Sequence, residues 1–402
     1  MSGPLFGVKV VENTLFQQGP VAGAKLGDLG ADVIKIEPKS GDPGRDMMRM
    51  VSLETGISGY NFYFENSNRN KRSLALDMKT TAGIEVFFKI VDKADVFLTN
   101  MSIDAPINLG IGPDVLMKRN PRLIYAQASG WGRKGPDARD YSFDYTGIAR
   151  SGLMMACGEA GDPPGRILPG LGDELGGMVC AWSVTAALYA REKTGIGQLV
   201  DTSLMGSIIS MLGLSISCGA ILDQEFIRSK RSDAGNPLYN HYRCKDNKWI
   251  ALAHLQPERY WPKICQAMGI QNLEKDARFD TVGSRGKNAQ ELIGIFDRLF
   301  SSKPRDEWVN LLKEGGCICT PIQSPLEVSK DPQAIANNYV LNIEHPEIGK
   351  TRILGFPWDF HGTPAEYHHA APKLGEHTDE ILREAGYSAQ AITKLRDDGV
   401  IA

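Results

Sequence analysis

The chain has 402 residues and a formal net charge of −3, and its length corresponds to roughly two or three domains. Apolar residues make up 42% and charged residues 23%, which is the composition of a folded globular protein and excludes intrinsic disorder. The near-neutral charge argues against a general nucleic-acid binder. We expect no membrane span and no signal peptide, because no apolar run reaches about 18 residues and the start lacks a basic segment.

The cysteine pattern indicates reduced thiols. The seven cysteines are odd in number, scattered, and never spaced as Cys-x-x-Cys, which in a chain of this length predicts a cytoplasmic protein without disulfides. The seven histidines form no His-Glu-x-x-His pattern, so the sequence predicts no metal site. The cysteines are Cys157, Cys180, Cys218, Cys244, Cys265, Cys317 and Cys319.

The first forty residues predict a βαβ unit, which normally belongs to a parallel sheet. Residues 6–11 form an apolar run typical of a buried strand, residues 19–27 a helix of small residues, and residues 31–36 a second strand that ends at Glu37. The turn after the first strand lacks the G-x-G-x-x-G pattern. A nicotinamide or flavin site is therefore not expected.

The pattern of strand and helix continues and predicts an α/β fold with a Rossmann-like, doubly wound parallel sheet. A glycine-rich loop, residues 129–136, follows one of these strands, and the helix that begins at Glu174 is rich in small residues. The predicted elements are strand 73–76, helix 81–94, strand 96–99, helix 112–119, strand 123–127, helix 174–192 and helix 201–214.

A smaller α+β domain is expected after about residue 218. Two strand-like runs within 241–252 flank the turn 245–248, and helical patterns follow at 258–268, 289–300 and 305–313. From about residue 332 the chain reads as loop, with one more helix at 379–385 and a short tail. The expected domains are a large α/β domain (1–205), a linker (206–225), the small domain (226–334), and a return linker with the C-terminal part of the large domain (335–402).

The segment 169–177 combines glycines with a carboxylate, Asp173, at the start of the long predicted helix. Free backbone N–H groups and the helix dipole stabilise an anion at such a position, and the glycines let a ligand approach the backbone. The alternative is that Asp173 only caps the helix, and chemistry alone favours the cap.

Several segments, in order and over nearly the whole chain, are similar to class III CoA-transferases, the formyl-CoA transferase and carnitine CoA-transferase family. Any one match is weak, whereas together they are strong. The region 235–245 lacks the glycine-rich loop of formyl-CoA transferases and resembles the branch that handles 2-hydroxyisocaproate and benzylsuccinate. The matching segments are 17–20, 30–38, 41–42, 70–77, 130–136, 172–173, 190–198 and 372–378.

The resemblance implies that Asp173 is a covalent nucleophile. It also implies that CoA moves from an acyl-CoA such as succinyl-CoA to a carboxylic acid, here a 2-hydroxy acid or an aryl- or alkylsuccinate, in anaerobic metabolism. The backbone amides of 172–174 and the side chain of Gln17 are the expected oxyanion donors; for Gln17 the alternative is a solvated loop residue. CoA is substrate and carrier, with no tightly bound cofactor. The family forms interlocked dimers, so we expect a homodimer or a hetero-oligomer with a related subunit.

Cationic residues in family-like segments are the candidates for contacts with CoA phosphates. Met47, Met48 and Tyr145 are candidates for an apolar substrate pocket, with Met50, Met154 and Met155 as further methionines. The alternatives are a solvated charge cluster at 69–72 and methionines that simply fill the core. The arginine that the family carries soon after the position of Asn100 is missing here. The candidate CoA-binding residues are Lys39, Lys71, Arg72, Leu74 and Lys134.

Two other functions fit the same fold. The superfamily includes 2-methylacyl-CoA racemases, which use a histidine at the position of Phe143; phenylalanine cannot transfer protons, so an isomerase ranks below a transferase. A non-catalytic subunit of a hetero-oligomer is the second alternative. The retained Asp173 and Gln17 argue against it.

Overall fold

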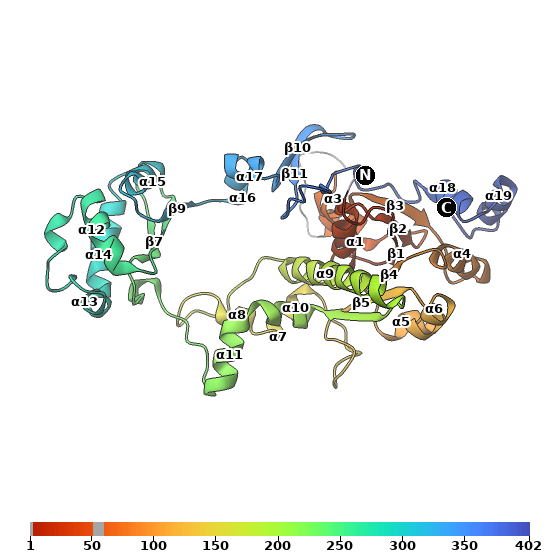
Figure 1. Ribbon diagram of the computed structural model, residues 1–402, viewed down its shortest axis with the longest axis horizontal. Helices are drawn as coiled ribbons and strands as arrows, with labels where there is room; N and C mark the ends of the chain where they lie inside the picture. The colour runs from red at the N-terminus through yellow and green to blue at the C-terminus, as the bar shows by residue number, and fades with distance from the viewer. Residues whose placement is uncertain (1–2, 51–59) are drawn as a thin grey trace. The chain divides into compact units, whose positions relative to one another are not determined.

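The structure is a computed structural model that describes residues 3–50 and 60–402 (Figure 1). The chain forms two compact units, each discontinuous in sequence. The larger unit takes its residues from 1–155, 166–224 and 333–402, and the smaller from 156–165 and 225–332.

Residues 206–225, expected as a linker, are mostly helical, and all but Glu225 belong to the larger unit. They contain α10 (Leu204–Met211) and α11 (Gly213–Leu222). The apolar residues of this stretch favour helix once the side chain of Ser203 caps α10 by accepting the Gly206 N–H. Among the described residues no single helix is long and apolar enough to cross a membrane; α10 and α11 match that length and composition only as a pair bent by 83°.

The larger unit is built on a six-stranded sheet in which every neighbouring pair is parallel, with the order β3-β2-β1-β4-β5-β6. The predicted parallel α/β sheet is thereby confirmed. One strand was missed, because residues 201–203 were assigned to a helix. The strands are β1 (Lys9–Asn13), β2 (Asp32–Glu37), β3 (Lys71–Ala75), β4 (Val96–Thr99), β5 (Ile124–Ser129) and β6 (Leu199–Ser203).

Successive strand residues face opposite sides of the sheet, and each side is covered by helices. On β1, Val10 belongs to a buried cluster with Leu26 and Val184, whereas Val11 belongs to a second cluster with Phe87. Helices α1 (Gln18–Asp28) and α9 (Leu171–Thr194) contribute to the first cluster. The helices of the second cluster are α4 (Thr81–Val91), α6 (Pro113–Arg119), α18 (Thr378–Glu384) and α19 (Ala389–Asp397).

The C-terminal part of the chain contains more regular structure than the sequence predicted. An antiparallel hairpin, β10 (Val340–His345) and β11 (Gly349–Leu354), lies in the stretch expected as loop, and α19 lies in the expected tail. Ile401 pairs with Leu76 beyond the end of β3. The following short helices lie outside the two sheet-covering clusters: α2 (Met47–Met50), α3 (Phe62–Asn68), α5 (Asp104–Asn108), α7 (Asp144–Arg150), α8 (Leu153–Ala156) and α17 (Pro332–Ala336).

The smaller unit confirms the predicted α+β domain. Its sheet is antiparallel, in the order β7-β8-β9, with β7 (Tyr239–Arg243), β8 (Trp249–Ala253) and β9 (Cys319–Ile322). The expected turn 245–248 joins β7 to β8. The helices are α12 (Pro257–Ala267), α13 (Val282–Lys287), α14 (Ala289–Phe300), α15 (Arg305–Glu314) and α16 (Pro325–Val328).

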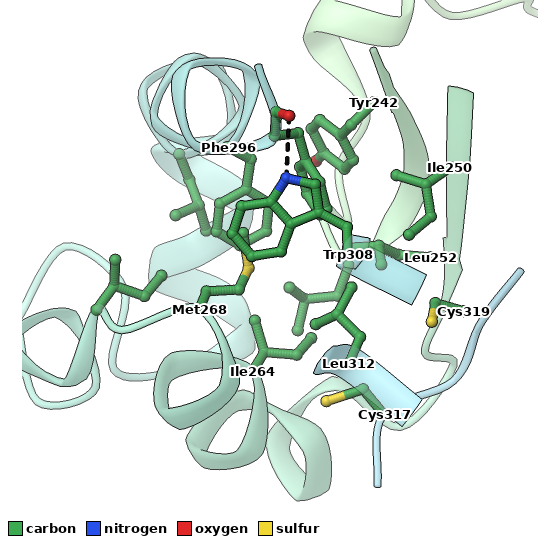
Figure 2. Packing of buried hydrophobic residues seen from close by; sticks show 14 of the residues in the cluster. Tyr242, Ile250, Leu252, Ile264, Met268, Phe296, Trp308, Leu312, Cys317 and Cys319 are labelled. Atoms are coloured by element: carbon green, nitrogen blue, oxygen red, sulfur yellow. Dashed lines mark hydrogen bonds between the residues drawn. The ribbon is translucent and has the colours of Figure 1, made fainter. Parts of the chain in front are cut away.

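The core of the smaller unit is apolar, and its few polar atoms are hydrogen-bonded (Figure 2). The indole of Trp308 donates to the carbonyl of Phe300 at 3.0 Å, the bond drawn in Figure 2. Buried His254 is held as the neutral tautomer: Nδ1 faces the Leu238 carbonyl at 3.1 Å, so it carries the proton, and Nε2 accepts the Ile318 N–H at 2.8 Å. Burial lowers the pKa of His254.

Candidate active site

Asp173 lies in the first turn of α9, as the sequence predicted. The turn begins after Gly170, whose φ of +84° is a left-handed conformation that glycine adopts without strain. Asp173 is half-buried. The N-terminal end of a 24-residue helix therefore carries a carboxylate that is only partly open to solvent.

Close packing of α9 against α1 brings Gln17 to this turn. A Cβ atom on Gly177 would lie 2.5 Å from Cγ1 of Val21, and one on Gly170 would lie 2.8 Å from Oε1 of Gln17. Only glycine fits at such distances. Gln17 Nε2 donates to Oε1 of Glu174 at 3.1 Å, so the two residues expected to act together share one end of the seam between the helices.

Asp144, the first residue of α7, caps α9 from outside and was not singled out from the sequence. Its Oδ2 accepts the Gly170 N–H at 2.8 Å, and its Oδ1 accepts the Asp173 N–H at 3.1 Å. The Glu174 N–H donates to the Gly170 carbonyl at 2.9 Å. The backbone N–H groups of Asp173 and Glu174, both expected as oxyanion donors, are thus hydrogen-bonded within the protein. The side-chain amide of Gln17 reaches the site.

The pKa of Asp173 rises from 3.8 to about 7, first because the carboxyl is desolvated and then because Asp144 and Glu174 repel its anion. Burial raises the pKa of the Tyr63 phenol above its usual range, and the nearby carboxylates raise it further. These carboxylates are Asp173, Asp42, Glu174 and Asp144. Tyr63 of α3 thus keeps its proton and is a neutral hydrogen-bond donor near the site. A strongly shifted carboxyl beside like charges is typical of functional sites.

The sheet topology places a ligand crevice beside these residues. From β1 the chain builds the sheet toward β2 and β3 on one side, and from β4 toward β5 and β6 on the other. In open parallel sheets, ligands bind between two such strands, beyond their carboxyl ends. Gln17 follows β1, and Asn100 follows β4. The Asn100 side chain bonds both backbone groups of Leu15 at 2.8 Å, which links the two strand ends.

Three of the candidate CoA-binding residues have internal roles instead. Leu74 is fully buried in the sheet, and so is Lys71, whose ammonium lies 2.8 Å from Glu12 and also donates to Pro20 and Asn68. Arg72 is held by three carboxylates, Asp32, Glu380 and Glu384, at 2.7–2.9 Å. Strand β3 turns these side chains into the fold. Lys39 and Lys134 are exposed in loops.

The candidate pocket residues differ in their surroundings. Tyr145 follows Asp144 in α7 and is 56% exposed, and Met47 is half-buried in α2. Met48 and Met154 are buried, as expected of methionines that fill the core, and Met155 is exposed. The side chain of Met50 lies outside the described residues. In the described part of the chain no group of three or more His, Cys, Asp or Glu side chains is placed to hold a metal ion.

Comparison with known proteins identifies the family of the chain. The model of CoA-transferase family III matches residues 5–378. The chain is 33% identical to (R)-2-hydroxy-4-methylpentanoate CoA-transferase of Clostridioides difficile, over 99% of both chains. It is 31% identical to cinnamoyl-CoA:phenyllactate CoA-transferase of Clostridium sporogenes, over 98% of this chain and 96% of the relative. A crystal structure of a CAIB/BAIF family protein from Brucella suis superposes with a TM-score of 0.86 at 28% identity, over 96% of this chain and all of that one. The chain belongs to CoA-transferase family III and is a CoA-transferase of that family.

Proposed function

We propose that the enzyme transfers CoA through a covalent intermediate on Asp173. An Oδ atom of ionised Asp173 attacks the thioester carbonyl of the acyl-CoA, and the C–S bond breaks to give a mixed anhydride and CoA thiolate. The thiolate then attacks the Asp173 carbonyl, which releases the donor acid and leaves an aspartyl-CoA thioester. The acceptor carboxylate attacks that thioester, the C–S bond breaks, and a second mixed anhydride and CoA thiolate form. The thiolate then attacks the acceptor's carbonyl in this anhydride, which forms the new acyl-CoA and releases the carboxylate of Asp173.

The raised pKa of Asp173 is the observation that carries the proposal. A desolvated carboxylate lacks the water shell that makes carboxylates weak nucleophiles, and at pH 7 a large share of the molecules is still ionised. Thiols are poor competitors for this role in the described structure. Burial raises the pKa of Cys265 to about 12 and that of Cys180 to about 11.

Gln17 is the proposed oxyanion donor. Its Nε2 already lies at the first turn of α9 and is bound to Glu174, a bond that it can exchange for the developing oxyanion of the tetrahedral intermediate. The missing Cβ of Gly170 leaves room for the Gln17 amide itself, because a Cβ there would lie 2.8 Å from Oε1 and 3.0 Å from Nε2. Exposed Lys39 and Lys134 are the proposed partners of the CoA phosphates.

The proposed acceptor is a 2-hydroxy acid with a bulky apolar group, or an aryl- or alkylsuccinate. The relatives named above for 2-hydroxy-4-methylpentanoate and phenyllactate support the first class. Half-buried Met47 and exposed Tyr145 are the proposed apolar walls, and the Phe16 and Phe143 rings meet edge to face 6.1 Å apart beside the site residues. Phe143 also removes the proton carrier that a racemase needs.

We further propose that the enzyme works as an interlocked dimer, with an identical or a related chain. Helix α11 is apolar, yet none of its residues is buried. Trp182 of α9 and Met211 of α10 are 73% and 67% exposed beside an apolar hollow of about 640 Å³ that Trp358 also lines. Apolar surface of this extent is stable in water only when another surface covers it. A monomer in dilute solution, measured by light scattering, would refute this part.

The cellular setting is also a proposal. All seven cysteines are free, which fits a reducing compartment, so we place the enzyme in the cytoplasm. Its proposed place in anaerobic acid metabolism rests on the resemblance to the family branch described above.

The decisive experiment screens acyl-CoA donors against carboxylic acid acceptors by mass spectrometry. Wild-type enzyme incubated with its acyl-CoA and then hydroxylamine should be labelled at Asp173 alone. Asp173→Asn should abolish labelling and lower turnover by several orders of magnitude, whereas Asp114→Asn, an exposed aspartate in the first turn of α6, should leave both unchanged. Labelling of another residue refutes the mechanism, and an inactive wild-type chain favours a non-catalytic subunit.

A further inference from the structure

The loop that delivers Gln17 is held by side chains from neighbouring strands. Between β1 and α1, the carbonyl of Asn13 accepts from the hydroxyl of Thr99 at 3.0 Å, and the carbonyl of Thr14 accepts from Lys35 Nζ at 3.0 Å. Asn100 bonds both backbone groups of the next residue, Leu15, at 2.8 Å. The chain is thus fixed residue by residue up to Leu15, two residues before Gln17.

Phe16, the residue before Gln17, has a φ of +61°. A left-handed conformation is uncommon for a bulky side chain and persists only where the surroundings hold it. Asp42 fixes the backbone of Phe16, because its Oδ1 accepts the Phe16 N–H at 3.0 Å. Asp42 Oδ1 also accepts the Gly44 N–H at 2.8 Å, so the atom is fixed from two sides.

Asp42 is itself held rigidly. It is 2% exposed, its Oδ2 lies 2.9 Å from Nζ of fully buried Lys35, and its backbone N–H donates to Glu37 at 3.0 Å. Burial alone would lower the pKa of Lys35, but Asp42, Glu12 and Glu37 outweigh burial and raise it, so the ammonium of Lys35 remains charged. A buried ion pair of this kind resists separation, because removal of either partner would leave an uncompensated buried charge.

We propose that Asp42 is a positioning residue of the transferase reaction, which acts through the backbone of Phe16 to aim the amide of Gln17. The effect of Asp42 on Gln17 passes through Phe16, the strained residue whose N–H its side chain binds. Asn100 supports the same loop one residue earlier. The inference rests on the proposed role of Gln17 as the oxyanion donor.

The test is a double-mutant cycle between Asp42→Asn and Gln17→Ala, with kcat and KM measured for each variant. Asp42→Asn is expected to lower kcat by on the order of ten- to a hundredfold, the usual effect of a misplaced catalytic group, with little change in the KM for acyl-CoA. In the Gln17→Ala background the same substitution should lower kcat by less than about twofold, because the group that Asp42 aims is already absent. Asn100→Ala is a second variant for the same cycle, should Asp42→Asn fail to fold.

A purely structural role predicts a different result, namely the same fall in kcat in both backgrounds, and that result overturns the proposal. An unchanged kcat in Asp42→Asn or in Gln17→Ala overturns it as well. Hydroxylamine trapping keeps this failure distinct from a failure of the proposed function: label at Asp173 retains the covalent mechanism even where the cycle is additive, whereas label elsewhere removes it.

Discussion

Asp173→Asn should make the protein more stable at neutral pH while it abolishes turnover. Asn keeps the shape of the side chain but carries no charge, and the start of α9 stays capped because Gly170 and Asp173 donate their N–H groups to Asp144. The folded state raises the pKa of Asp173 from 3.8 to about 7. Each unit of this shift corresponds to about 1.36 kcal/mol, so the ionised carboxylate opposes folding by about 4 kcal/mol.

The sign and the pH window follow from the two pKa values. Below pH 3.8 the carboxyl is protonated in both the folded and the unfolded state and costs nothing. Between pH 3.8 and about 7 only the unfolded state is ionised, so the wild type loses stability as pH rises, by about 1.4 kcal/mol per unit. Above pH 7 the loss is complete and constant.

Urea denaturation of both proteins at pH 5 and pH 8, at one protein concentration, measures the effect. The free energy of unfolding of Asp173→Asn should exceed that of the wild type by about 2 kcal/mol at pH 5 and by about 4 kcal/mol at pH 8, as upper limits. Asp114→Asn, the control on exposed α6, should show no such growth with pH. A wild type that is as stable as Asp173→Asn at pH 8 would refute the reasoning that Asp173 is a desolvated and repelled carboxylate.

Three other predictions concern the same forces. The value of kcat/KM should rise through about pH 7 as Asp173 ionises, and Asp144→Asn should shift this rise to lower pH because a repelling charge is lost. An unchanged profile in Asp144→Asn would contradict the electrostatic origin of the raised pKa of Asp173. Gly177→Ala should lower the free energy of unfolding by about 1–3 kcal/mol through overpacking against α1, whereas Gly294→Ala, in an open part of α14, should raise it by up to about 1 kcal/mol. The smaller unit should lose stability as pH falls below 6.5, because His254 is protonated in the unfolded state but stays neutral in the folded state, where its pKa is lowered. His254→Gln should reduce this pH dependence, measured by thermal unfolding followed by the fluorescence of the core tryptophans.

The sequence predicted the strands whose residues are buried along most of their length. Strands β1, β2, β4 and β5 are apolar on both faces because helices cover both sides of a parallel sheet. β6 was missed because it is only partly buried in the described unit, and its residues 201–203 run directly into α10. The hairpin β10–β11 was missed because its polar, half-exposed residues give the weak pattern of a strand without a buried face.

The site was predictable where chemistry is local and unpredictable where it depends on tertiary packing. A carboxylate after glycines at a helix start indicated Asp173, and resemblance added Gln17. Asp144 lies 29 residues from Asp173, and only the arrangement of α7 against α9 makes it the cap. The internal roles of Lys71 and Arg72 likewise depend on which face of β3 meets the core and α18, which the local sequence does not reveal.

The pairing of Ile401 with Leu76 has a consequence for synthesis on the ribosome. The edge of β3, and the part of the apolar side of the sheet that α4 and α6 leave uncovered, stay open until residues 378–401 arrive, because α18, α19 and the last residues cover them. The smaller unit is complete at residue 332, whereas the larger must wait for residues 333–402, roughly 4–14 s at about 5–20 residues per second. During that interval the nascent chain carries an uncovered strand edge, which makes the larger unit the part that depends on chaperones.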